Sequence, residues 1–122
     1  MSEKVLIASF EFILESATLI EKWFEEIAHP DDYVASSLGK SHYDATLMRL
    51  QSIGETLKKI DRTQPDLLAK YKNTRWNDII RLREIISHHY EQLSQEIIYD
   101  ICKNDLPALR KDVQQILTGL TG

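Results

Sequence analysis

Hydrophobic side chains recur along the chain at the spacing of one helix face. From about Glu3 to Ala28 they follow one another at intervals of three and four residues, and the other faces carry charged residues such as Glu11, Glu15 and Glu21. Such intervals place side chains on one stripe of an α-helix. His29-Pro30 then ends the segment, because the residue before a proline disfavours the helical region. The pattern predicts a long first helix, whose stripe comprises Leu6, Phe10, Ile13, Ala17, Ile20, Phe24 and Ile27.

Three further long helices are expected. One runs from about Ser41 to Asp61 and carries Gly54 on its apolar stripe, where a glycine usually lets another helix approach closely. Another covers about Trp76 to Tyr90. A short helix from Pro65 to about Lys72 separates these two, with proline in its first turn.

The last helical region begins at Ser94, a residue type that caps helix N-termini. Pro107 interrupts the apolar repeat of this region, which predicts either a kink or a helix restart capped by Asn104 or Asp105. No stretch alternates as a strand would. The expected fold is all-α, an up-and-down bundle of four main helices plus a short helix, forming one domain over residues 1–122.

Composition agrees with this fold and adds expectations about oligomeric state and cellular location. The 122 residues are 43% hydrophobic and 28% charged, enough for one core. Three long apolar stripes offer more surface than one small bundle readily hides, which favours a homodimer. The single Cys102 excludes an internal disulfide, and charges near the N-terminus argue against a signal peptide. We expect a cytoplasmic protein without a membrane segment.

Charge is unevenly distributed along the chain. The total is -4, yet residues 58–83 carry eight basic and three acidic side chains. A local basic surface can attract phosphate even when the whole chain is acidic. Basic residues on solvated helix faces would give the same count. The basic side chains are Lys58, Lys59, Arg62, Lys70, Lys72, Arg75, Arg81 and Arg83.

The chain lacks the sequence motifs of several kinds of functional site. There is no glycine-rich phosphate loop, nucleophile elbow or cysteine cluster. Glu26-Ile-Ala-His29 has the spacing used in di-iron bundles, but these need a second such motif and two more carboxylates. We therefore expect no metal and no cofactor.

The segment Arg83-Glu-Ile-Ile-Ser-His88-His89-Tyr90 carries the candidate chemistry. Arginine can bind phosphate through two hydrogen bonds, and histidine can move a proton to or from a ribose hydroxyl. On an ideal helix Tyr90 shares a face with Arg83, whereas His88 lies about 140° away. An arginine paired with a carboxylate such as Glu84 or Glu55, beside ordinary surface histidines, is favoured on spacing alone.

Arg-x4-His-x-Tyr resembles the signature of HepT-like toxins, within the HEPN superfamily of all-helical ribonucleases. Three further segments resemble this family in the same order. They are Ile53-Gly54-Glu55, Trp76-Asn77-Asp78-Ile79-Ile80, and Asn104-Asp105-Leu106-Pro107-Ala108-Leu109.

The resemblance implies a HEPN-like bundle in which Arg83 and His88 cleave RNA without a metal. It implies a homodimer with its active sites in a cleft along the interface. It also implies a type VII-like toxin–antitoxin pair, with a minimal nucleotidyltransferase as antitoxin that transfers AMP to Tyr90.

Three neighbouring residues complete the candidate site. Glu55 is expected to orient Arg83, and His89 supplies a second imidazole. Glu84 departs from the small polar residue, often asparagine, that is common after the arginine. A carboxylate there could pair with Arg83 or repel phosphate.

Two functions therefore remain open. The first is an endoribonuclease toxin that acts on transfer RNA or messenger RNA. The second is a non-catalytic helical partner that docks a nucleotidyltransferase.

Overall fold

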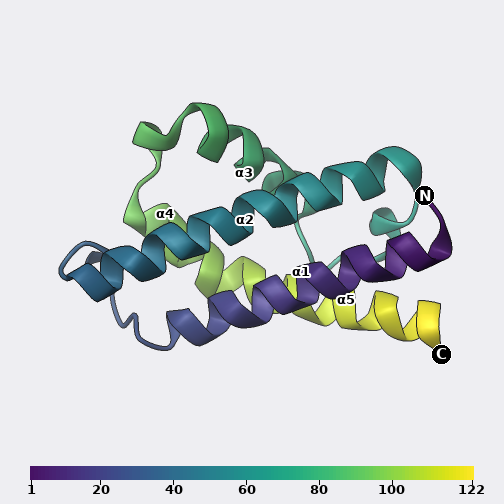
Figure 1. Cartoon of the computed structure of the whole chain (residues 1–122), viewed down its shortest axis with the longest axis horizontal. Coiled ribbons are helices and arrows are strands. Elements are labelled where there is room, and N and C mark those ends of the chain that lie inside the picture. Colours follow the sequence, from purple (N-terminus) through teal and green to yellow (C-terminus); the bar gives the residue numbers. More distant parts are fainter.

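The computed structural model describes all 122 residues as a helical bundle without strands, which confirms the expected fold class (Figure 1). The helices are α1 (Glu3–Phe24), α2 (Ser37–Thr63), α3 (Trp76–His88), α4 (Gln95–Asp100) and α5 (Leu106–Thr121). The shorter elements are the 3₁₀ turns η1 (Pro30–Tyr33), η2 (Leu68–Lys70) and η3 (Tyr90–Gln92), and the π-helical segment η4 (Ile101–Asp105). Because α4, η4 and α5 follow one another without a break, they act as the fourth long helix.

The predicted stripe of α1 forms part of the core. Phe10, Ile13, Ala17 and Ile20 are fully buried, and Leu6 nearly so. All buried hydrophobic side chains belong to one continuous cluster to which every long helix contributes. Helix α1 packs against both α2 and α5, while α3 packs on α2 (Figure 1). No helix combines the length and the apolar character needed to cross a membrane.

The connection between α1 and α2 differs from the expected boundaries. Helix α1 ends at Phe24, before the predicted end at Ala28. The turn that follows is closed by the Asp32 carboxylate, which accepts hydrogen bonds from the backbone N–H groups of Ala28 and His29 at 2.8 and 3.0 Å. These bonds to its charged form lower the pKa of Asp32. Helix α2 starts early because the Ser36 hydroxyl caps it, accepting from the Gly39 N–H at 3.0 Å.

The expected short helix between α2 and α3 is only the 3₁₀ turn η2. The segment after it is held by side chains instead. Asp112 of α5 is fully buried and accepts hydrogen bonds from Asn73 at 3.0 Å and Thr74 at 2.7 Å. The indole N–H of Trp76 donates to the Tyr71 carbonyl at 2.7 Å. These bonds fix the point from which α3 begins.

The Ser94 cap is present, with its hydroxyl accepting from the Ile97 N–H at 3.4 Å. Neither Asn104 nor Asp105 caps a restarted helix. Asn104 donates to the Asp100 carboxylate at 2.7 Å, and Asp105 binds Arg75. The chain accommodates Pro107 by widening into η4, so that the proline falls in the first turn of α5, where its missing N–H is tolerated.

Candidate functional site between α2 and α3

Helices α2 and α3 run antiparallel and approach closely at Gly54. A β-carbon built on Gly54 would lie 3.0 Å from the Ile79 carbonyl oxygen and 3.1 Å from the Arg83 β-carbon. The glycine therefore permits an approach that any side chain would obstruct. It places Arg83 directly over α2, with its side chain 29% exposed.

Glu84 links Arg83 to His88. One oxygen of its carboxylate accepts a hydrogen bond from Arg83 Nη1 at 3.0 Å. The other lies 3.8 Å from His88 Nε2, and the His88 side chain is 65% exposed. An ideal helix separates Arg83 and His88 by about 140°, and Glu84 stands between them. The Glu84 carboxylate thus lies within 4 Å of both Arg83 and His88, and its contact with His88 is an ion pair only when the imidazole is protonated.

Tyr90 lies beyond the end of α3, where the sequence predicted that the helix would continue, but it faces α2 as Arg83 does. Helix α3 ends at His88, and Tyr90 begins the turn η3. Its hydroxyl donates to the Asp44 carboxylate of α2 at 3.4 Å. Partial burial and the negative charge of Asp44 raise the pKa of Tyr90, so the phenol stays protonated and acts as the donor.

Of the two carboxylates considered as partners of Arg83, Glu84 is the one in contact. Glu55 is exposed on α2 and forms no ion pair within the chain. His89 is exposed at the C-terminal cap of α3, where the backbone leaves the helical conformation. The two adjacent imidazoles therefore belong to different local structures.

The antiparallel pairing brings together residues that the sequence did not single out. Gln51, three residues before Gly54, donates to the Ser87 hydroxyl at 2.7 Å. Asp44, two turns further back, reaches Tyr90. A groove of about 360 Å³ lies between these contacts, lined by Asp44, Leu47, Met48, Gln51, Ile86 and Tyr90. Pairing Gly54 with Arg83 in an antiparallel register would have revealed these neighbours from sequence.

The basic block of residues 58–83 is only partly available to a ligand. Arg75 forms a two-nitrogen contact with the Asp105 carboxylate at 2.8 to 3.0 Å and lies 3.7 Å from Asp78. Its hydrogen bonds to Asp105 raise the pKa of Arg75 further. Lys58, Lys59 and Arg81 are exposed and form no ion pair.

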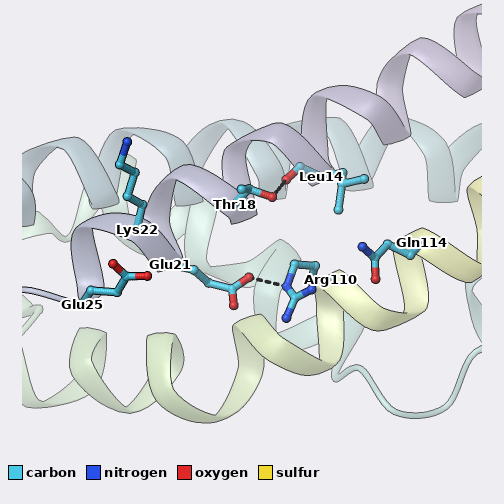
Figure 2. Close-up of a pocket in the computed structure, with 7 residues that line it drawn as sticks. All are labelled: Leu14, Thr18, Glu21, Lys22, Glu25, Arg110 and Gln114. Carbon is cyan, nitrogen blue, oxygen red and sulfur yellow. Dashed lines mark hydrogen bonds and ion pairs between the residues drawn. The ribbon is translucent and has the colours of Figure 1, made fainter.

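The largest hollow of the surface, about 580 Å³, lies elsewhere, between α1 and α5 (Figure 2). Its walls are joined by an ion pair between Arg110 Nε and Glu21 at 2.7 Å. Lys22 points away from this ion pair (Figure 2), and no histidine or cysteine lines the hollow. The size of a hollow therefore does not identify the site. The candidate catalytic residues lie where α2 and α3 pack together around Gly54 and Arg83, which is the α2–α3 seam.

Metal-ligating side chains do not converge in this chain. No group of three or more His, Cys, Asp or Glu side chains lies close enough to hold a metal ion. Glu26 and His29 lie beyond the end of α1, so their spacing is not that of residues on one helix face.

Residues 13–116 match the model of the family described as "Ribonuclease HepT-like". A Methanocaldococcus jannaschii protein named "Putative RNase" is 32% identical over 68% of this chain and 66% of its own length. A second protein from that organism, named "Gamma-glutamylcyclotransferase and putative RNase", is 26% identical over 88% of this chain and 46% of its own length. The chain thus spans less than two thirds of these two relatives.

A "Probable ribonuclease HepT" of Thermococcus cleftensis is 26% identical over 87% of this chain and 90% of its own length. No solved structure matches the chain significantly. The family match covers most of the chain and includes the whole α2–α3 seam. The chain belongs to the HepT-like ribonuclease family.

Proposed function

We propose that this protein is a metal-independent endoribonuclease in which Arg83 binds the scissile phosphate and His88 transfers a proton. The observation that carries the proposal is that Arg83 and His88 lie within 4 Å of the same Glu84 side chain on α3, with 29% and 65% of their own side chains exposed to solvent. Family membership supports RNA as the substrate. A guanidinium remains charged at every physiological pH, and an imidazole titrates near neutrality, so the pair suits phosphodiester cleavage.

The chemistry uses the ribose 2′-hydroxyl as an internal nucleophile. The 2′-oxygen attacks phosphorus while His88 accepts its proton, and the bond from phosphorus to the 5′-oxygen breaks. Water protonates the departing 5′-oxygen. The products are a 2′,3′-cyclic phosphate and a 5′-hydroxyl. Arg83 offsets the negative charge that builds up on the equatorial oxygens.

The proposal includes a homodimer. Apolar side chains are exposed at the end of the bundle that also carries η3, namely Val34, Leu38 and Ile97. Helix α4, which contains Ile97, packs on η1, and Val34 directly follows η1. A symmetric contact there would bring the His88 ends of two α3 helices toward one interface. Light scattering measures the oligomeric state of the wild type and of Leu38→Asp in solution. A monomeric wild type would contradict the proposed dimer.

We further propose that a minimal nucleotidyltransferase restrains the enzyme by transferring AMP to Tyr90. The Tyr90 hydroxyl attacks the α-phosphorus of ATP and pyrophosphate leaves, while the phenol proton passes to a base. Tyr90 is half-exposed and lies two residues after His88, which supports its access to an external enzyme. An adenylyl group there would add bulk and negative charge beside the phosphate path.

A second function, that of a non-catalytic docking partner for a nucleotidyltransferase, is favoured by one observation. The Glu84 carboxylate already occupies Arg83 at 3.0 Å. In this alternative the Glu84 carboxylate neutralises the charge of the Arg83 guanidinium, and Arg83 binds no phosphate.

Expression in a bacterial host separates the two functions. We expect wild-type protein to arrest growth, and His88→Ala to relieve the arrest at equal protein level. Tyr90→Phe should stay toxic when the nucleotidyltransferase is co-expressed, since its hydroxyl is gone. Toxicity that survives His88→Ala, or an absence of toxicity from soluble wild type, would favour the docking partner.

A further inference from the structure

We propose that the groove beside Tyr90 is a subsite for one nucleobase of the RNA, and that Asp44 selects a base carrying an exocyclic amino group. The inference rests on the proposed function, because it takes RNA as the ligand. It adds a binding site on α2 that would give the enzyme a base preference.

The position of the groove relative to Arg83 supports this occupant. Ile86 of the groove is three residues beyond Arg83 on α3, and Gln51 is three residues before Gly54, which faces Arg83 on α2. Three residues advance a helix by about 4.5 Å. A phosphate bound at Arg83 would therefore have the base of a neighbouring nucleotide within reach of the groove.

The lining has the composition of a base-binding surface. Leu47 and Ile86 form a buried apolar floor, and Met48 and Tyr90 stand at the rim, 69% and 51% exposed. Proteins bind splayed-out bases of single-stranded RNA by stacking them on aromatic rings and reading their edges with polar groups. Tyr90 offers the ring, and Asp44 and Gln51 offer the polar groups.

Asp44 gives the groove its selectivity. A carboxylate only accepts hydrogen bonds. Its Oδ1 accepts from the Tyr90 hydroxyl at 3.4 Å, and its Oδ2 makes no hydrogen bond within the chain. The free oxygen suits the amino group of cytosine N4 or adenine N6, and it repels the O4 carbonyl of uracil. The Gln51 amide both donates and accepts, so it accommodates either kind of base.

Binding of labelled short oligoribonucleotides tests the proposal. His88→Ala serves as the background so that the RNA stays intact, and fluorescence anisotropy compares oligo-C with oligo-U. We expect oligo-C to bind at least about five-fold more tightly, the lower end of discrimination by a well-placed base contact. Adding Asp44→Ala should make the two affinities equal. Adding Glu15→Ala, which removes an exposed carboxylate from α1, should leave the preference unchanged.

Three results would overturn the subsite. They are equal binding of both oligomers with Asp44 intact, a preference that survives Asp44→Ala in a folded protein, and dissociation of a dimer by Met48→Asp with the preference unchanged. The last would assign the groove to a second copy of the chain.

The experiments distinguish a failure of the base subsite from a failure of the proposed ribonuclease function. If wild type cuts RNA without an Asp44-dependent preference, the ribonuclease stands and the subsite falls. If wild type cuts nothing but the preference depends on Asp44, the subsite stands and the catalytic assignment falls.

Discussion

In the proposed mechanism, the residue that follows Arg83 influences how readily the guanidinium binds phosphate. Glu84 contacts it at 3.0 Å, with side chains that are 29% and 52% exposed. An ion pair with this exposure contributes about 0 to 1 kcal/mol, because water screens both charges. A phosphate with favourable two-point geometry can therefore displace it. Glu84 would weaken RNA binding without abolishing it.

Replacing Glu84 by Gln should lower the KM for RNA by up to about five-fold, the equivalent of 1 kcal/mol. The amide removes a charge that competes with phosphate for Arg83 and repels the substrate. Steady-state cleavage of a labelled oligoribonucleotide measures the change. Glu11→Gln on α1 makes the same charge change far from Arg83 and should leave KM unaltered. A higher KM in Glu84→Gln would mean that the carboxylate assists binding.

We expect the Cys102 thiol to be unreactive toward thiol reagents in the folded protein. Burial raises the pKa of its thiol to about 12, and the side chain is 2% exposed. The reactive thiolate is therefore scarce at every physiological pH. A chromogenic disulfide reagent should label native protein very slowly at mildly alkaline pH and label urea-unfolded protein at once. Rapid labelling of the native protein would show that the core around Cys102 opens.

At the scale of elements, the seam between α2 and α3 depends on Gly54. The apolar stripes of both helices were predictable from periodicity, and so was close approach at the glycine. The end of α3 at His88 was not, since neither proline nor glycine marks it in the sequence. The cause lies in the tertiary structure: η3 must turn the chain toward α4, and Tyr90 gains its contact with Asp44 there.

Gly54→Ala should destabilise the protein, while Gly119→Ala should not. The new methyl group at residue 54 would meet two atoms of α3 at 3.0 and 3.1 Å and push the helices apart. At residue 119, in α5, a β-carbon meets nothing within 4 Å, so alanine gains about 0.5 to 1 kcal/mol of helix propensity. Urea unfolding compares the two, with about 1 to 3 kcal/mol lost in Gly54→Ala. Equal stability of both variants would refute close packing at the seam.

At the scale of the molecule, sequence periodicity predicted the bundle but could not predict which helices pair. Hydrophobic spacing is local, and it places Leu6 or Ile13 on a buried face without naming the opposing helix. Contacts such as Asp44 with Tyr90, 46 residues apart, follow from the antiparallel register of two helices. For the same reason the sequence indicated Arg83 and His88 as candidates but did not single out Asp44 and Gln51, which line the neighbouring groove. The helix-end errors arose where side chains, such as Ser36 and Asp32, cap or close turns.

Cleavage of a mixed cellular RNA pool in EDTA by purified wild type, Arg83→Ala and His88→Ala tests the roles of Arg83 and His88. We predict that wild type cuts without added metal and leaves 5′-hydroxyl ends, and that both variants lose at least about a hundred-fold in rate while their circular dichroism is unchanged. Folded wild type that cuts only with added metal, or a His88→Ala variant as active as wild type, would contradict the account.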